Sequence, residues 1–111
     1  MSREQEIATL LKEKYSDQLL FEDEDKPLDP LAFRTPEGDS LLHIASIRGD
    51  IQSIEQLLSL GIDIDLQGDM GNTALHYARR HGQHQAYQTL LDRGASPDIV
   101  NEFGEPASGR E

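Results

Sequence analysis

The sequence predicts an all-α fold, a short solenoid of stacked helix pairs, and three observations lead to this prediction. The run Ser-Leu-Leu-His-Ile-Ala at residues 40–45 returns as Thr-Ala-Leu-His-Tyr-Ala at residues 73–78, a spacing of 33. Glycines recur at the same interval, at Gly38, Gly71 and Gly104. Aromatic residues make up only 5% of the chain, so Leu, Ile and Ala must build the core. A fixed period of this size marks a unit that buries its apolar face only by stacking on a neighbour.

The first segment is expected to be an amphipathic helix. Ser2 can cap it, and Gln5 can complete a capping box three residues later. Apolar side chains then recur at helical spacing along one face: Ile7, Leu10, Leu11 and Tyr15. Such a helix would cover the open end of the stack, which a solenoid requires for solubility.

An acidic connector is expected next. Four successive carboxylates at residues 22–25 and two prolines, Pro27 and Pro30, oppose a regular element. The run is either a solvated loop or an acidic contact for a basic partner, and the sequence leaves both open. Residues 1–34 are therefore expected to form an N-terminal capping helix and an acidic connector.

Each repeated unit is expected to open with a tight turn and a short helix. The repeated glycines stand among Asp, Asn and Glu, a setting typical of turns with a positive backbone dihedral. Ser40 and Thr73 follow where a helix N-cap belongs. The short helices should end at Gly49 and Gly82. The second helices, with the glycines that end them, are expected at residues 51–60 with Gly61 and 84–93 with Gly94.

This arrangement resembles ankyrin repeats. Residues 73–78 are close to the Thr-Pro-Leu-His core of that family, and residues 90–95 resemble the end of its second helix. The resemblance implies one domain over residues 1–111, with repeats at 35–67 and 68–100 and a truncated third repeat and tail at 101–111. The chain departs from the family pattern at Leu41 and Ala74, which replace proline, and at Ser46 and Arg79, which replace alanine. These departures suggest terminal, capping-type repeats in a short stack.

Charge and composition restrict the function. The chain carries 21 acidic and 10 basic side chains, a net charge of −11. Phosphate contacts need clustered Lys and Arg, so nucleic acids and anionic membranes are disfavoured as partners. The acidity either favours a basic partner or only keeps the protein soluble. No signal-peptide or membrane-spanning run is evident, and a cytoplasmic location is expected.

Catalysis and metal binding are not expected. The resemblance implies that His43 and His76, each with the Ser40 or Thr73 hydroxyl three residues earlier, tie a turn to the neighbouring unit. His81 and His84 lack a metal-ligand spacing, and the chain has no Cys. No nucleotide or nucleophile motif is present. No enzyme activity and no cofactor are therefore predicted.

The resemblance also places a partner-binding surface on the turn tips and on the exposed side of each first helix. Apolar residues among charged ones are the usual anatomy of an interface. Alternatively, Ile47 and Met70 pack against one another and Phe103 seals the C-terminal end. The predicted partner-binding residues are Glu37, Asp39, Ile47, Arg48, Asp69, Met70, Asn72, Arg80, His81, Glu102 and Phe103.

These observations predict a non-catalytic protein-binding module, a monomer or weak homodimer whose partner is another protein, with a basic surface as one option. The chain is similar to small free-standing bacterial ankyrin proteins, some of which inhibit toxins, so an immunity role toward a basic toxin is one hypothesis. A homo-oligomeric scaffold joined through exposed stack ends is the alternative. A metal-dependent or His-dependent enzyme is a third class.

Overall fold

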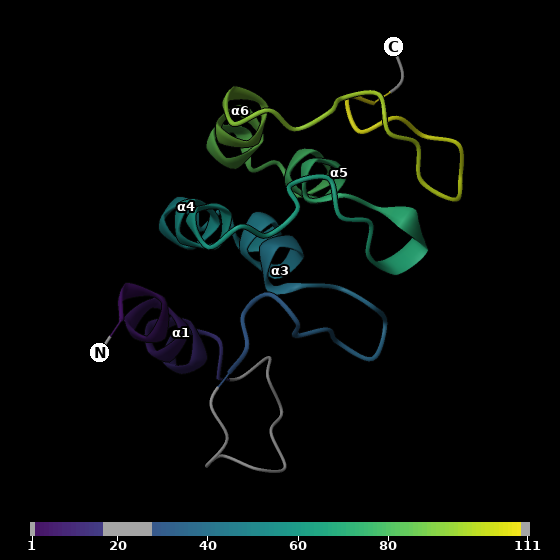
Figure 1. The fold of residues 1–111 in the computed structure, drawn as a ribbon. Coiled ribbons are helices and arrows are strands. Elements are labelled where there is room, and N and C mark those ends of the chain that lie inside the picture. The colour runs from purple at the N-terminus through teal and green to yellow at the C-terminus, as the bar shows by residue number, and fades with distance from the viewer. Residues whose placement is uncertain (1, 17–27, 110–111) are drawn as a thin grey trace.

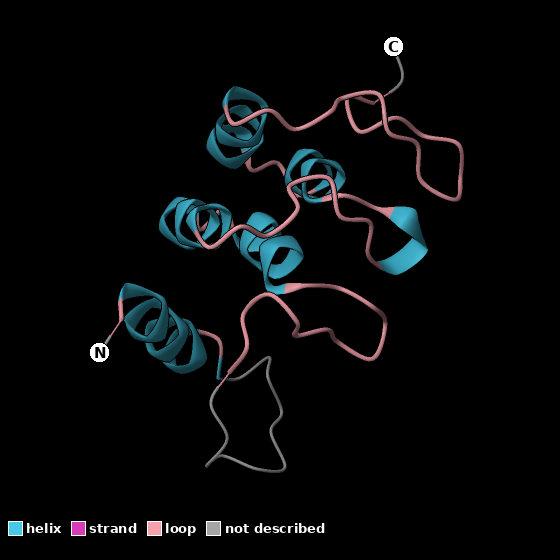
Figure 2. Ribbon diagram, viewed as in Figure 1, coloured by secondary structure: helices cyan, strands magenta, loops and turns pink. Residues whose placement is uncertain are grey.

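The computed structural model describes residues 2–16 and 28–109, and its regular elements are helical (Figures 1 and 2). No β-strand occurs in these ranges, where an isolated bridge joins Val100 to Pro106. The acidic run at residues 22–25 lies outside the described residues. The elements are α1 (Arg3–Lys14), α3 (Leu41–Arg48), α4 (Ile51–Ser59), the 3₁₀ turn η1 (Asp69–Gly71), α5 (Ala74–Arg80) and α6 (His84–Asp92). The all-α prediction is confirmed.

Two helix pairs stack on one another. Within the pairs, α3 packs on α4 and α5 on α6; between them, α3 packs on α5 and α4 on α6. Figure 1 shows α1 beside the first pair and three turns projecting from the α3–α5 side of the stack. The molecule measures 46 × 27 × 20 Å along its principal axes. No helix in the described part of the chain is long and apolar enough to cross a membrane.

Capping boxes start three of the helices, where the sequence predicts one box, at Ser2, and simple N-caps at Ser40 and Thr73. The Ser2 hydroxyl accepts from the Gln5 amide, and the Gln5 side chain accepts from the Ser2 amide. Ser40 and Thr73 form the same reciprocal pairs with His43 and His76, so an imidazole takes the place that Glu or Gln usually holds. Each pair satisfies two backbone amides that a helix start leaves without partners.

The ends of the helices differ slightly from the expectation. Gly49 ends α3 in the left-handed conformation, with φ 68°, as predicted. In the second unit α5 ends at Arg80 and His81 is its C-cap, so Gly82 follows one residue later. The helices α4 and α6 end one residue before the predicted bounds, at Ser59 and Asp92.

The core follows the repeat. Leucines one period apart are almost fully buried, at Leu42 with Leu75 and at Leu57 with Leu90. Ala45 and Ala78 are buried at the corresponding place in the first helices, where a small side chain allows helices to approach closely. Burying a leucine side chain stabilises a fold by roughly 2 kcal/mol, so this shared register accounts for much of the stacking energy.

The N-terminal helix is held by both apolar and polar contacts. Ile7, Leu11 and Tyr15 are buried. The prediction for Leu10 is wrong, because its side chain is 53% exposed. The buried residues recur every four positions, so the stripe in contact with the stack is narrow and position 10 turns away from it. The apolar residues 19–21 that follow lie outside the described residues.

A polar cluster completes this contact. The Tyr15 hydroxyl donates to Asp50 Oδ2 at 2.7 Å, and Lys14 Nζ lies 3.2 Å from the same oxygen. The Arg48 guanidinium covers the Tyr15 ring at 4.6 Å from its centroid. Burial opposes ionisation of Asp50, but hydrogen bonds from Ser53, Tyr15 and Lys14 outweigh it and lower the pKa of this carboxyl.

The C-terminal end of the stack is covered by the chain itself. After the third turn, Ala107 is buried and its amide donates to the Ile99 carbonyl at 3.0 Å. Gly109 lies against the Arg79 guanidinium, so closely that a Cβ there would overlap it. Arg79 therefore contacts the tail where a further repeat would otherwise lie.

Candidate protein-binding surface

Three turns of the same construction project from the stack (Figure 1). Each is closed by a backbone hydrogen bond across five residues: Thr35 to Asp39 at 2.8 Å, Gly68 to Asn72 at 2.8 Å and Asn101 to Glu105 at 3.0 Å. The donors are residues 35, 68 and 101, one period apart. The third unit thus forms its turn although no helix follows it within the described residues.

The first turn is joined to the second through Asp39. Its Oδ1 accepts from the Asp69 amide at 2.9 Å and from the Tyr77 hydroxyl at 2.8 Å. Burial, with this hydrogen bond, raises the pKa of Tyr77 above its usual value. The side chain of Asp39 is only 15% exposed, so it offers little surface to a partner. Its role is to join the first turn to the second.

The second turn is joined to the third in a different way. The Glu102 amide donates to the Met70 carbonyl at 2.9 Å, and Asn101 Nδ2 donates to Asn72 Oδ1 at 2.9 Å. Asn72 is 2% exposed, and this corrects its placement among partner-binding residues. The side-chain amide of Asn72 hydrogen-bonds the third turn, just as the carboxylate of Asp39, one period earlier, hydrogen-bonds the second turn.

Met70 stands at the tip of the second turn in an unusual backbone conformation. With φ 57° it is the one residue other than glycine, among those described, that has a positive φ. A side chain in this region costs on the order of 1 kcal/mol. The following Gly71 is packed tightly, because a Cβ there would lie 3.1 Å from the Glu102 amide nitrogen and 3.3 Å from Asn101 Cα.

Apolar side chains are exposed on two neighbouring tips. Met70 is 48% and Phe103 is 60% exposed, and they occupy equivalent positions one period apart. The equivalent position in the first turn is the exposed Glu37. Exposed Glu102 and half-buried Asp69 lie next to the two apolar residues in the chain. These five residues, Glu37, Asp69, Met70, Glu102 and Phe103, are called the tip surface below.

Val100, the last residue of the predicted second repeat, is not among the predicted partner-binding residues. It is 52% exposed, and Gln67 Nε2 joins its carbonyl to that of Gly71 with contacts of 3.2 and 2.9 Å. A single apolar residue in a loop gives no periodic signal of exposure. Only the contact between turns shows that it lies beside the tip surface.

The predicted residues on the first helices lie in several environments. Ile47 is half-buried, and its carbonyl accepts from Gln83 Nε2 at 2.8 Å. Arg48 is exposed but stacks on Tyr15, so it belongs to the contact with α1. Arg80 is exposed, and its Nη2 lies 3.5 Å from Asn72 Oδ1. His81 is also exposed, and the centroid of its ring lies 6.4 Å from that of the Tyr77 ring. Of these four, Arg80 and His81 adjoin the second turn.

The two repeated histidines connect the start of each first helix to a backbone carbonyl 23 or 29 residues further along the chain. His43 Nδ1 accepts from the Ser40 amide at 2.9 Å, so Nε2 carries the proton and donates to the Leu66 carbonyl at 2.8 Å. His76 has the same contacts, with the Thr73 amide at 3.0 Å and the Glu105 carbonyl at 2.8 Å. Burial lowers the pKa of His43, which keeps its ring neutral.

A serine, a histidine and an aspartate are close together here, but their geometry opposes nucleophilic catalysis. Ser40 Oγ lies 2.9 Å from His43 Nδ1, and Asp39 Oδ1 lies 4.0 Å from the same nitrogen. A catalytic arrangement would place the nucleophile and the orienting carboxylate at opposite ring nitrogens of the histidine base. Ser40 is also fully buried, so a substrate has no access to its hydroxyl. Within the described ranges, no three His, Cys, Asp or Glu side chains gather as a metal site.

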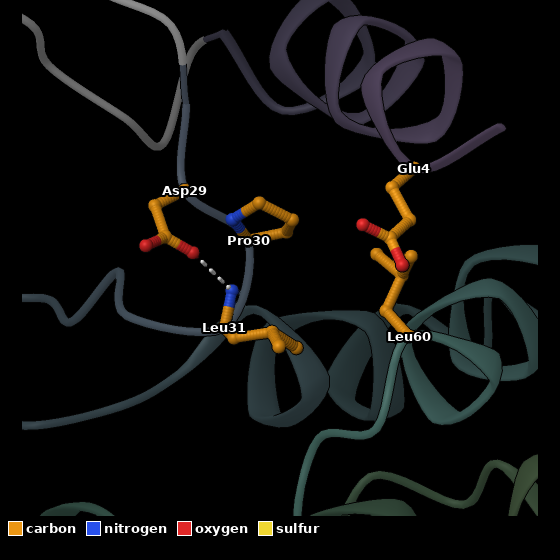
Figure 3. Close-up of a pocket in the computed structure, with 5 residues that line it drawn as sticks. All are labelled: Glu4, Asp29, Pro30, Leu31 and Leu60. Atoms are coloured by element: carbon orange, nitrogen blue, oxygen red, sulfur yellow. Dashed lines mark hydrogen bonds between the residues drawn. The ribbon is translucent and has the colours of Figure 1, made fainter. Parts of the chain in front are cut away.

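A small pocket lies away from the turns, between the start of α1, the segment before the first turn and the end of α4 (Figure 3). Its volume is about 210 Å³, below the range of roughly 300–1,000 Å³ that is usual for small-molecule sites. Its walls contain two carboxylates and three apolar residues: Glu4, Asp29, Pro30, Leu31 and Leu60. These walls offer no convergent set of hydrogen-bond donors for a ligand.

Comparison with known proteins agrees with this architecture. A family model described as ankyrin repeats (3 copies) matches residues 11–101, most of the chain. No match was found among curated proteins. The matched range includes both helix pairs and ends at the start of the third turn, so the repeat geometry and the family model describe the same segment. The chain belongs to the ankyrin-repeat family.

Proposed function

We propose that this chain binds a partner protein, without catalysis, through the tip surface and the adjoining Arg80 and His81. Ankyrin repeats are generic protein–protein interaction modules. The observation that supports the proposed site is the pair of exposed apolar side chains, Met70 and Phe103, on tips that the stack holds side by side. Large apolar side chains in a charged surround are the usual centre of an interface.

The hydrogen bonds between the turns support the same proposal. Asp39 and Asn72 join the turns by hydrogen bonds, so the tip residues are positioned before a partner arrives. Preorganised contacts lose less conformational entropy on binding than contacts on mobile loops. The acidic side chains around them favour a partner with a basic surface through electrostatic steering. A basic toxin is one class of such partner.

Affinity capture with variants of the full chain tests the proposal. The bait is the wild type, a double variant Glu102→Ala, Phe103→Ala, or the control Gln85→Ala on the exposed surface of α6. We expect a protein captured by the wild type and the control to be lost with the double variant, and its yield to fall with added salt. Equal capture by all three baits, with the double variant shown to be folded, would contradict the proposed site.

The scaffold alternative is less well supported because the chain covers both stack ends itself, with α1 at one and residues 106–109 at the other. We therefore propose a monomer. Light scattering tests it, and a mass that rises with protein concentration would favour the homo-oligomer. The cytoplasmic location stays a prediction of the sequence.

A further inference from the structure

The apolar part of the tip surface consists of Met70 and Phe103. It spans two neighbouring turns, which the hydrogen bond from the Glu102 amide to the Met70 carbonyl holds together. Gly71 adds to this closeness, because it lies against the backbone of Asn101 and Glu102. Two exposed apolar side chains on adjacent turns fit one apolar side chain of a partner better than a broad domain face.

Carboxylates flank this apolar pair. Glu102 adjoins Phe103 in the chain, Asp69 adjoins Met70, and Glu37 stands at the equivalent tip of the first turn. The ion pairs of Lys14 with Asp50 and of Arg93 with Glu55 lie elsewhere in the molecule. In the part of the chain that the structure describes, none of the three tip carboxylates forms a salt bridge with Lys or Arg. Their charge is therefore available to a cationic partner.

We propose that the tip surface takes a short basic segment of a partner protein, with one apolar side chain seated between Met70 and Phe103. Lys or Arg side chains on either side of it face Glu37, Asp69 and Glu102. The proposal rests on the proposed function and specifies the chemistry of the partner. Phosphate groups of nucleic acids or lipids are repelled by the same carboxylates and do not fit this site.

A displayed library of random 12-residue peptides, selected on the immobilised full chain, tests this chemistry. We expect the enriched peptides to share an apolar residue flanked by Lys or Arg. Enrichment of acidic peptides, of apolar peptides without basic residues, or of none at all would overturn the proposal.

Binding of one enriched peptide, labelled and followed by fluorescence anisotropy, then locates the site. Met70→Gly or Phe103→Ala should weaken binding on the order of tenfold, as loss of an interface anchor does. Leu10→Ala is the matched control, because the exposure of Leu10 lies between those of Met70 and Phe103 while Leu10 lies on α1, away from the turns (Figure 1). Met70→Gly removes the side chain at a position where glycine suits the backbone, so unfolding does not account for the loss.

The charged contacts have their own control. Glu102→Gln should weaken the peptide and reduce its salt dependence, whereas Glu13→Gln on the exposed side of α1 should do neither. If Leu10→Ala or Glu13→Gln weakens the peptide as much as the tip variants, the assigned site is wrong. If affinity capture depends on the tips but no basic peptide is enriched, the proposed function stands and this partner chemistry fails. If capture does not depend on the tips either, both fail.

Discussion

At the scale of single residues, Met70 combines an exposed apolar side chain with a left-handed backbone. Its φ of 57° directs the chain so that its carbonyl accepts from Glu102. Replacement by Ala and replacement by Gly both remove the side chain beyond Cβ, and Ala keeps a Cβ, which a left-handed backbone disfavours. We expect Met70→Gly to be more stable than Met70→Ala by about 1 kcal/mol in urea unfolding. A Met70→Ala variant as stable as Met70→Gly would mean that the backbone there is not strained.

His43 makes stability depend on pH near neutrality. Burial lowers its pKa below the usual 6.5, so the unfolded chain binds more protons as the pH falls through that value. The stability due to the neutral ring is therefore fully present above about 6.5 and declines as the pH drops below it. We expect the free energy of unfolding to fall between pH 7 and 5 in the wild type, and to fall less in His43→Gln.

The comparison of variants is needed because protonation of carboxylates also relieves repulsion in a chain of net charge −11. His84→Gln is the control, since His84 is exposed on α6. Parallel pH profiles for wild type and His43→Gln would contradict the role given to this ring. The lowered pKa of Asp50 acts in a different window, below its usual value of 3.8, where stability is lost as the carboxylate is protonated.

At the scale of elements, α1 depends on a few polar contacts with the start of α4. The Tyr15 hydroxyl is buried and donates to Asp50, which also caps α4 through the Ser53 amide. Tyr15→Phe removes this donor and leaves the ring in place. We expect a loss of roughly 1–2 kcal/mol in the free energy of unfolding, measured with urea. Tyr87→Phe on the half-buried face of α6 is the control. An equal loss in both variants would mean that removing a tyrosine hydroxyl costs the same anywhere, and that the hydrogen bond to Asp50 has no special role.

Sequence pattern predicted the elements well because caps and glycines act locally. Ser2, Ser40 and Thr73 start helices where their hydroxyls reach an amide three residues later. Leu10 shows the limit of periodicity: residues 10 and 11 both lie within an apolar stripe, but the narrow contact of α1 accepts only one of them. The width of a buried stripe depends on the neighbouring element, and the helix itself does not encode it.

At the scale of the whole molecule, the family resemblance predicted which residues lie at the tips but not which of them are used within the stack. Asp39 and Asn72 are equivalent polar positions on successive turns, and both are occupied by contacts with the following turn. Met70 and Phe103 are left exposed. Whether a tip residue is buried or exposed depends on the spacing between turns, and that spacing is set by tertiary packing far from the tip residues. Sequence could therefore locate the candidate surface and could not select its members.

That spacing can be tested at Gly71, where the second and third turns lie close together. Gly71 and Gly82 both have positive φ, 76° and 69°, but a Cβ on Gly82 meets nothing within 4 Å. Alanine at either position should cost about 1 kcal/mol for its backbone conformation. Gly71→Ala should cost more in urea unfolding, because a Cβ there presses on the backbone of Asn101 and Glu102 and the third turn must move.

Amide chemical shifts of residues 101–105 should change in Gly71→Ala and remain unchanged in Gly82→Ala. That movement of the third turn separates Phe103 from Met70, so Gly71→Ala should also weaken binding of the basic peptide, although it alters no side chain of the tip surface. Equal stability and equal peptide binding in the two variants would mean that this contact does not hold the turns in register.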